Sequence, residues 1–420
     1  MNVTISDIEL FKQKALKWAN TFDVCCLLDS NQYQDPYSRF DFLIAANAEK
    51  KIELRNSTAA FEDLNTFRKE NTGWVFGGLG YDLKNEIEDL QSDNLDHLDF
   101  PDLFFFAPKH LIFLKGNQLK INSSEAEEIW KNINNVVLED DSHPTKLNIQ
   151  CRFSKADYLN TIENIKEEIG RGNIYETNFC MEFFAEDAII NPTQVFKELN
   201  SASPTPFANY FKWFDHYVLS ATPERFLSKK GRKLISQPIK GTAKRSEDIT
   251  EDEQIKKELS NHPKEQQENV MIVDLVRNDL TKSAKKGTVA VEELFGVYSF
   301  KQVHQMISTV VCELKDDITN SEILKNSFPM GSMTGAPKIK AMQLMEHFER
   351  TKRGLYSGAI GYFSPEDDFD FNVIIRTVLY NKKEKYLSFQ VGSAITYYAE
   401  AEKEYEECLL KVKAILEVLA

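Results

Sequence analysis

The sequence predicts an α+β protein in which large antiparallel β-sheets form a two-layer core with helices packed outside. Three observations lead to this prediction. The 420 residues exceed most single cores, so two lobes or one large two-layer body are expected. Long stretches such as 174–234 are rich in aromatic and β-branched residues, which favour strands. Between them lie amphipathic segments that begin at capping residues, as helices do.

The first elements alternate between these two kinds of segment. Ser6 is expected to cap a helix that runs to about Lys17, with apolar residues at helical spacing. Strands are expected at 24–30 and 36–48. The glycine-rich stretch 74–83 contains GGLGY, which lacks the GxGxxG register, so we expect close packing of a strand against a helix and no dinucleotide loop.

The next stretch, 101–121, is expected to form two strands joined at Pro108 and Lys109, with a turn at Gly116 and Asn117. Serine and early acidic residues predict a helix over 123–137. The acidic, proline-broken run 138–146 is the best candidate boundary. It divides an N-terminal region, 1–140, from a second region, 147–420.

The second region begins with a helix over 154–172, capped by Ser154 and stopped near Gly170 and Gly172. After the strand-rich segment that follows, another helix is expected at 264–280. Shorter strands are expected around 358–363, 371–380 and 389–399, before a last helix.

Composition excludes several classes of function. The net charge is −14 and no basic block exceeds a pair of residues, so nucleic acid is not an expected partner. The six cysteines form no CxxC pair and predict reduced thiols, not a zinc site. No signal peptide and no run of 18 apolar residues is visible, so we expect a cytoplasmic protein with no membrane partner.

The stretch QPIKGTAKR, residues 237–245, holds Lys240 between a proline-fixed entry and a glycine-permitted exit. Pro238 favours extended geometry before it, and Gly241 allows the backbone to turn or to approach a ligand closely. A lysine in such a place is either a solvated surface residue or, if it is desolvated in a pocket, a nucleophile.

Two predicted helices each carry a pair of glutamates three residues apart, which puts both carboxylates on one face. The pairs are Glu265 with Glu268 and Glu404 with Glu407, and Lys411 follows one turn later. Each pair alone is typical of a solvated helix face. If the pairs converge, a divalent cation or protonation must offset their repulsion, and oxygen ligands favour Mg²⁺ or Ca²⁺.

Other polar residues stand among apolar neighbours. Gly335 and Ala336 lie in GSMTGAPK, which suits an anion at a helix start or is simply a tight loop. Arg376 lies in an otherwise apolar predicted strand, and a buried guanidinium usually pairs with an anion. His304 is similarly surrounded and is either structural or part of a site.

Together these motifs resemble the chorismate-utilising enzymes, and most closely the branch that forms aminodeoxychorismate. The resemblance runs from about Leu27 to the end, through GNIYETNF, SATPERF, QPIKGT, ENVMIVDLVRNDL, GSMTGAPK, GAIGY, NVIIRT, VGSAIT and EYEECLLKVKA, in the order of that family. LLDS and PYSRFD also look like an N-terminal region that lines an amino-acid effector pocket in anthranilate-forming relatives.

The resemblance implies a role for each matching residue. Glu268 and Glu407 match Mg²⁺ ligands, and Glu265 and Glu404 match residues that hold metal-bound water. The remaining matches hold the substrate or line its cavity: Arg376, the backbone of Gly392, Ser393 and Ala394, Lys411, the turn at Gly335 and Ala336, Thr334, Tyr362 and Thr242, with His304 as an active-site histidine.

The resemblance also distinguishes the branches. Anthranilate-forming relatives typically carry alanine where this chain has Lys240, the lysine proposed to attack C2 of chorismate, and Glu224 matches the acid that protonates the leaving C4 hydroxyl. Water-using relatives carry lysine at the position of Glu176. Aminodeoxychorismate-forming relatives often have glutamine there, so Glu176 is a departure.

The expected activity is therefore Mg²⁺-dependent transfer of ammonia to C4 of chorismate, on the folate side of metabolism. No cysteine lies in a glycine-rich nucleophile elbow, so a separate glutaminase subunit is the expected partner. Two alternatives remain: anthranilate synthesis on the same scaffold, and a catalytically silent subunit that senses an amino acid.

Overall fold

Antiparallel strand pairing dominates the computed structural model, which describes residues 1–138 and 146–419. The helices are α1 (Ile8–Ala19), α2 (Ala60–Glu70), α3 (Lys84–Ile87), α4 (Ala126–Asn134), α5 (Lys155–Gly170), α6 (Pro192–Ala202), α7 (Ile249–Asn261), α8 (Pro263–Thr281), α9 (Asn320–Ser327), α10 (Lys338–Phe348) and α11 (Ala401–Leu419), with short 3₁₀ turns η1 (Tyr81–Leu83) and η2 (Gly331–Met333).

The strands are β1 (Asn2–Thr4), β2 (Val24–Asp29), β3 (Phe42–Leu54), β4 (Val75–Leu79), β5 (Leu103–Lys115), β6 (Gln118–Asn122), β7 (Gln150–Cys151), β8 (Glu176–Ala185), β9 (Phe207–Trp213), β10 (His216–Thr222), β11 (Arg225–Lys230), β12 (Lys233–Gln237), β13 (Ile239–Lys244), β14 (Ala290–Ser299), β15 (Val303–Glu313), β16 (Gly335–Ala336), β17 (Ala359–Phe363), β18 (Phe369–Val373), β19 (Thr377–Asn381) and β20 (Tyr386–Thr396).

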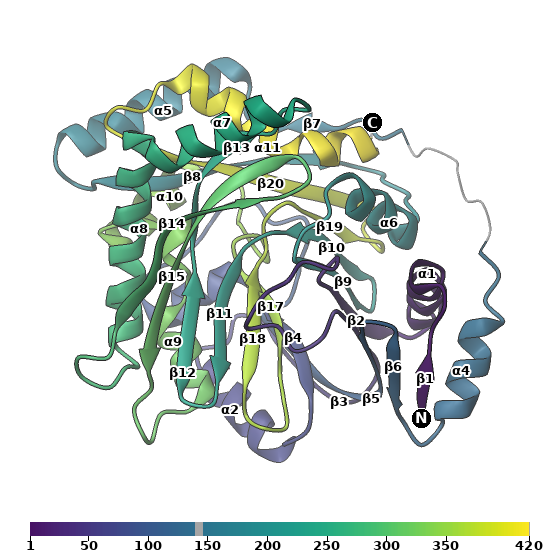
Figure 1. Ribbon diagram of the computed structural model, residues 1–420. Coiled ribbons are helices and arrows are strands. Elements are labelled where there is room, and N and C mark those ends of the chain that lie inside the picture. The colour runs from purple at the N-terminus through teal and green to yellow at the C-terminus, as the bar shows by residue number, and fades with distance from the viewer. Residues whose placement is uncertain (139–145, 420) are drawn as a thin grey trace.

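A continuous path of antiparallel pairs links most of these strands, in the order β8, β20, β19, β10, β9, β2, β3, β5, β4, β17, β18, β11, β12, β15 and β14. In Figure 1, β8 and β20 cross the upper part of the molecule, above the more upright strands β11, β12 and β15. Helices α5 and α11 cover the outer face of β8 and β20, and α8 flanks β14 and β15. The predicted α+β class with an antiparallel core and outer helices is confirmed.

Two apolar clusters fill the layers. One lies among β4, β5, β11, β17 and β18 and is closed by α2 and α8. The other lies between the sheet and the outer helices α1, α5, α6 and α11. Both clusters contain residues from each of the two predicted regions, because β2 pairs with β9 and β4 pairs with β17. The predicted boundary at 138–146 falls mainly on 139–145, which lie outside the described residues. The regions 1–140 and 147–420 therefore share one sheet.

Several predicted elements differ in detail. The first helix is capped by Asp7, whose carboxylate accepts the Leu10 N–H, and not by Ser6. Residues 103–115 form a single strand, β5, and not two strands joined at Pro108. Pro108 is accommodated because it pairs with Ala48 at an irregularity in the register, where a missing N–H costs no ladder bond. Ser154 caps α5 as predicted.

Candidate active site

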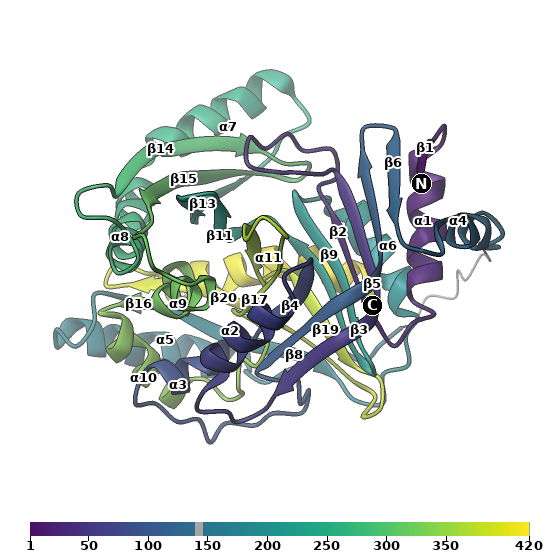
Figure 2. The same ribbon diagram turned by 90° about the horizontal axis from the view of Figure 1, so that it is seen from below.

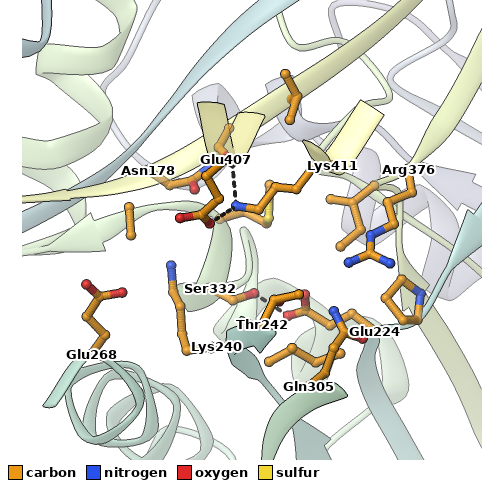
Figure 3. A pocket seen from close by; sticks show the side chains of 18 of the residues that line it. Asn178, Glu224, Lys240, Thr242, Glu268, Gln305, Ser332, Arg376, Glu407 and Lys411 are labelled. Carbon is orange, nitrogen blue, oxygen red and sulfur yellow. Dashed lines mark hydrogen bonds and ion pairs between the residues drawn. The ribbon is translucent and has the colours of Figure 1, made fainter. Parts of the chain in front are cut away.

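A cavity of about 130 Å³ lies between the two ends of the strand path. One wall comes from β8 and β20, the opposite wall from β13 and β15, and helices α8 and α11 close the side. Figure 3 shows Lys240, Glu268 and Glu407 pointing into one part of this space, with Arg376 and Glu224 in another part. Figure 2 shows α11 running behind the strands in the view from below.

Lys240 reaches the cavity because its strand is irregular at this point. The register between β13 and β15 shifts between Ile239 and Thr242, and a bulge of this kind re-aims side chains. Gly241 adopts φ +96°, and a Cβ there would lie 3.1 Å from the Glu265 Oε2 atom. Only glycine meets both conditions without strain. Asn269 donates its side-chain N–H to the Lys240 carbonyl over 3.5 Å, which links the bulge to α8.

Glu224 lies buried beside the cavity, where the Ser332 hydroxyl donates to its Oε1 over 2.6 Å. Burial raises the pKa of Glu224 to about 7, although that hydrogen bond and the charges of Lys240 and Arg376 favour the carboxylate. At neutral pH this group exists partly as a carboxylic acid, which can donate a proton.

Arg376 does not lie within a strand as predicted. It stands between β18 and β19 with φ 51°, and this left-handed residue turns the chain so that the guanidinium enters the cavity. Burial lowers the pKa of Arg376 to about 10, opposed by Glu224. The side chain remains a cation at neutral pH and can hold a substrate carboxylate.

The two glutamate pairs face the same cavity, as their spacing predicts if the helices converge. Burial and then the nearby Glu268 raise the pKa of Glu265, and burial and then Glu407 raise that of Glu404. Lys264 stands between the pairs, with its Nζ 3.6 Å from Glu268 Oε1 and 3.4 Å from Glu404 Oε1.

Whether these residues fit a metal ion depends on their arrangement and on their donor atoms. Within residues 1–138 and 146–419, no three His, Cys, Asp or Glu side chains are arranged to hold one. However, the donor set consists of carboxylate oxygens, the ligands that Mg²⁺ prefers. Glu268 Oε1 is buried without a hydrogen-bond partner. A cation already lies between the two glutamate pairs, because the ammonium of Lys264 contacts Glu268 and Glu404. The chemistry of the donors therefore fits a hard cation.

Lys411 connects the acidic helix to the sheet. Its ammonium lies 2.7 Å from Glu407 Oε1 and donates to the Gly392 carbonyl over 3.0 Å. Attraction by Lys411 lowers the pKa of Glu407. Although burial opposes it, this attraction also raises the pKa of Lys411, so the pair is charged at neutral pH.

Of the residues predicted from the sequence, the structure places these around the cavity: Glu224, Lys240, Thr242, Glu265, Glu268, Arg376, Gly392, Ala394, Glu404, Glu407 and Lys411. Six others do not line it. They are His304, Thr334, Gly335, Ala336, Tyr362 and Ser393.

Strand geometry explains two of these differences. Ser393 lies between Gly392 and Ala394, and since side chains alternate along a strand it points to the opposite face, where its hydroxyl lies 3.0 Å from the Tyr158 hydroxyl. Tyr362 belongs to β17 and packs against the rings of Phe40 and Trp74, at a different cavity under β2 and β9.

The other differences follow from local bonding. His304 is fully buried, and its ring nitrogens lie 2.9 Å from Ser299 Oγ and 3.0 Å from Asp252 Oδ1. Thr334 hydrogen-bonds the backbone of its own turn, while Gly335 and Ala336 pair with the start of β8. A Cβ at Gly335 would meet the Glu176 carbonyl at 2.4 Å, so this glycine serves close packing.

Several polar lining residues were not predicted: Asn178, Gln305, Ser332, Tyr356 and Gln390. Asn178 could have been found, because it stands two residues after Glu176 on the same strand face. Gln305 and Gln390 needed the strand register, and Ser332 and Tyr356 lie in turns whose position beside the cavity follows from the tertiary fold.

Comparison with known proteins identifies the family of the chain. Residues 23–417 match the family of chorismate binding enzymes. Aminodeoxychorismate synthase component 1 of Escherichia coli is 30% identical, with 94% of this chain and 92% of the relative covered. Anthranilate synthase component 1 of Acetivibrio thermocellus is also 30% identical, with 94% and 90% covered.

Solved structures show the same fold. Anthranilate synthase component I of Streptococcus pneumoniae superimposes with a TM-score of 0.78 at 24% identity, covering 91% of this chain and 93% of that one. The menaquinone-specific isochorismate synthase of Escherichia coli gives a TM-score of 0.76 at 16% identity, covering 100% and 94%. The family match spans nearly the whole chain and includes every element around the cavity, so this protein belongs to the chorismate binding enzymes.

Proposed function

We propose that this chain acts as an aminodeoxychorismate synthase component I, which transfers ammonia to C4 of chorismate and gives 4-amino-4-deoxychorismate. The observation that carries the proposal is the position of Lys240. It lines the same cavity as Glu224, Arg376 and both glutamate pairs. Relatives named aminodeoxychorismate synthase component 1 at about 30% identity support it.

The proposed reaction has two displacements. The amine of Lys240 forms a bond to C2, the two conjugated double bonds of the ring shift, and the C4–O bond breaks. Glu224 gives its proton to the departing hydroxyl, which leaves as water, because hydroxide itself leaves poorly. Ammonia then forms the C4–N bond, the two double bonds shift back, and the C2–N bond to Lys240 breaks.

The remaining residues bind and orient the substrate in this proposal. Arg376 and Lys411 are cations that can hold carboxylates, and the small residues Gly392 and Ala394 leave room for the ring. Glu268 and Glu407, assisted by Glu265 and Glu404, would hold Mg²⁺, which supplies positive charge for a ring carboxylate and offsets the acidic side chains.

A separate glutaminase subunit is the proposed source of ammonia. Component names among the relatives imply a second subunit. All six cysteines of this chain are free, and five of them are buried. Burial raises the pKa of the Cys180 and Cys408 thiols, which makes them poor nucleophiles. Within the described residues no cysteine has the properties needed to hydrolyse glutamine.

A second candidate is anthranilate synthesis, because relatives with that name are equally similar. Lys240 argues against it, because anthranilate-forming relatives typically carry alanine at this position. The two reactions are separated by their products: anthranilate fluoresces and forms without a further lyase.

The test is incubation of the chain with chorismate, Mg²⁺ and ammonium chloride, followed by mass spectrometry. We expect aminodeoxychorismate from the wild type and at least a ~100-fold loss, or a different product, from Lys240→Ala. Lys230→Ala, which removes an exposed lysine on β11, serves as the control. Unchanged aminodeoxychorismate formation by a folded Lys240→Ala protein would contradict the nucleophile assignment.

A further inference from the structure

Glu176 is a buried carboxylate for which the proposed chemistry gives no role. Its side chain is 2% exposed, and neither of its oxygens has a hydrogen-bond partner among the described residues. A buried polar atom without a partner costs on the order of 1–3 kcal/mol, and more when it is charged. Such a group calls for a ligand or for a bound proton.

The backbone around Glu176 is held firmly, so the missing partners are not supplied by a small shift of the strand. Glu176 opens β8 and is paired on one side with Ala336 of β16 and on the other with Thr396 of β20. Neither neighbour carries a charge. Gly335 packs against the Glu176 carbonyl, which leaves no space for the strand to move toward β16.

The active-site cavity lies along the same face of β8, although Glu176 itself is not one of its lining residues. Asn178, two residues further along β8, lines the cavity, and alternate residues of a strand share a face. Two charged groups of the cavity act on Glu176. Burial raises its pKa, Lys240 of β13 opposes the rise, and Glu268 of α8 adds to it. Glu176 is therefore buried next to the part of the cavity that holds Lys240 and Glu268.

We propose that Glu176 is the binding site for ammonium, the form in which most ammonia exists at neutral pH, and that it accepts a proton from it. Ammonium is small, carries four N–H donors and a positive charge, and so satisfies both orphaned oxygens. When one N–H bond breaks, the proton goes to the Glu176 carboxylate. The electron pair stays on nitrogen and forms the C4–N bond.

This inference rests on the proposed function but can fail separately from it. A first experiment uses the protein without chorismate. Tm is measured as ammonium chloride is added, and again in a parallel titration with tetramethylammonium chloride at equal ionic strength. We expect a saturable rise of about 1–2 °C with ammonium alone, which Glu176→Gln loses. Equal responses of the wild type to both salts would overturn the inference.

A second experiment measures aminodeoxychorismate formation by mass spectrometry as ammonium and pH vary. For Glu176→Gln we expect the KM for ammonium to rise at least ~10-fold at pH 7, while the KM for chorismate changes less than ~2-fold. The defect should shrink as pH rises, because solution then supplies free ammonia. If Glu176 had only a structural role, the size of the Glu176→Gln defect would not change with pH.

Glu186→Gln is the matched control, because it removes an exposed glutamate just beyond the end of β8. A wild-type KM for ammonium in Glu176→Gln would overturn the inference while leaving the proposed function intact. Conversely, if the wild type converts chorismate to another product, the proposed function fails, and the Tm titration still decides whether Glu176 binds ammonium.

Discussion

Glu224 should set the upper pH limit of the reaction. Burial raises its pKa from 4.5 to about 7, so the proton that it donates in the proposed reaction is lost as pH rises through 7. We expect kcat to fall above about pH 7 in the wild type. Glu224→Gln should lower kcat by about 10²- to 10⁴-fold and abolish this pH limb. The pH profile of product formation by mass spectrometry measures both effects.

The same pKa shift affects stability. Because the folded protein binds the Glu224 proton more tightly than the unfolded chain, its contribution is full below pH 4.5 and is lost as pH rises through about 7. In urea titrations, the stability difference between wild type and Glu224→Gln should change in that window. A pH-independent difference would show that Glu224 is ionised throughout.

At this scale, side-chain identity was predictable where local geometry decides it. Gly241 was expected to permit a close approach, and its φ and its distance from Glu265 agree. Tyr362 does not line the cavity, because the face on which a strand residue lies depends on register, and a shift of one residue reverses it. The hydrogen bonds of His304 to Ser299 and Asp252 join three separate elements, which no local pattern reveals.

Helices α8 and α11 form the acidic side of the cavity and should respond to Mg²⁺ as a unit. We expect Mg²⁺ to raise Tm saturably, because it replaces Lys264 as the cation between the pairs. Glu268→Gln and Glu407→Gln should weaken the apparent Mg²⁺ affinity by about 10- to 100-fold, both in Tm and in activity.

Glu406→Gln provides the control for this prediction. Glu406 also belongs to α11, but it faces outward and lies 3.5 Å from Lys155. Its replacement should leave the Mg²⁺ titration unchanged. A wild-type Mg²⁺ response in Glu268→Gln would contradict the assignment of the metal ligands.

The helices were the easiest elements to predict, since the spacing of glutamates and apolar residues fixes which face they present. Both α8 and α11 were expected, and their carboxylates meet at one cavity. The strands were harder. The sequence predicts that the strand ends at Pro108, but β5 continues through this residue because a register irregularity accommodates the proline ring. Arg376 was expected inside a strand, whereas it turns the chain between β18 and β19.

Over the whole molecule, a net charge of −14 should repel an anionic substrate, but a basic cavity adjoins the candidate active site. A second cavity of about 540 Å³ shares Thr242, Arg376, Glu407 and Lys411 with the first. Its other cations are Lys244, Arg245, Lys301 and Lys413, against the acids Glu247 and Glu417. A basic entrance of this kind accelerates the encounter with anions at low salt.

We therefore expect kcat/KM for chorismate to fall as ionic strength rises from about 0.02 to 0.2 M, because the Debye length shortens. Lys244→Gln should lower kcat/KM about 2- to 3-fold at low salt, with kcat unchanged and the difference lost at high salt. Lys120→Gln, an exposed lysine on β6, is the control. A salt-independent effect of Lys244→Gln would contradict electrostatic steering.

The overall class was predictable, but the strand order was not. Aromatic, β-branched segments fixed the expectation of antiparallel sheets, whereas pairings such as β2 with β9 connect residues about 180 positions apart. Within the described residues, no helix combines the length and the apolar character needed to cross a bilayer.

The interleaving of β2 and β4 among strands from the other half of the chain has a practical consequence. Dividing the chain near residue 140 would yield two polypeptides with unpaired strand edges. Each polypeptide would also expose its part of both apolar clusters. A fusion of this protein to a glutaminase should therefore keep the chain continuous and join the second protein at a terminus.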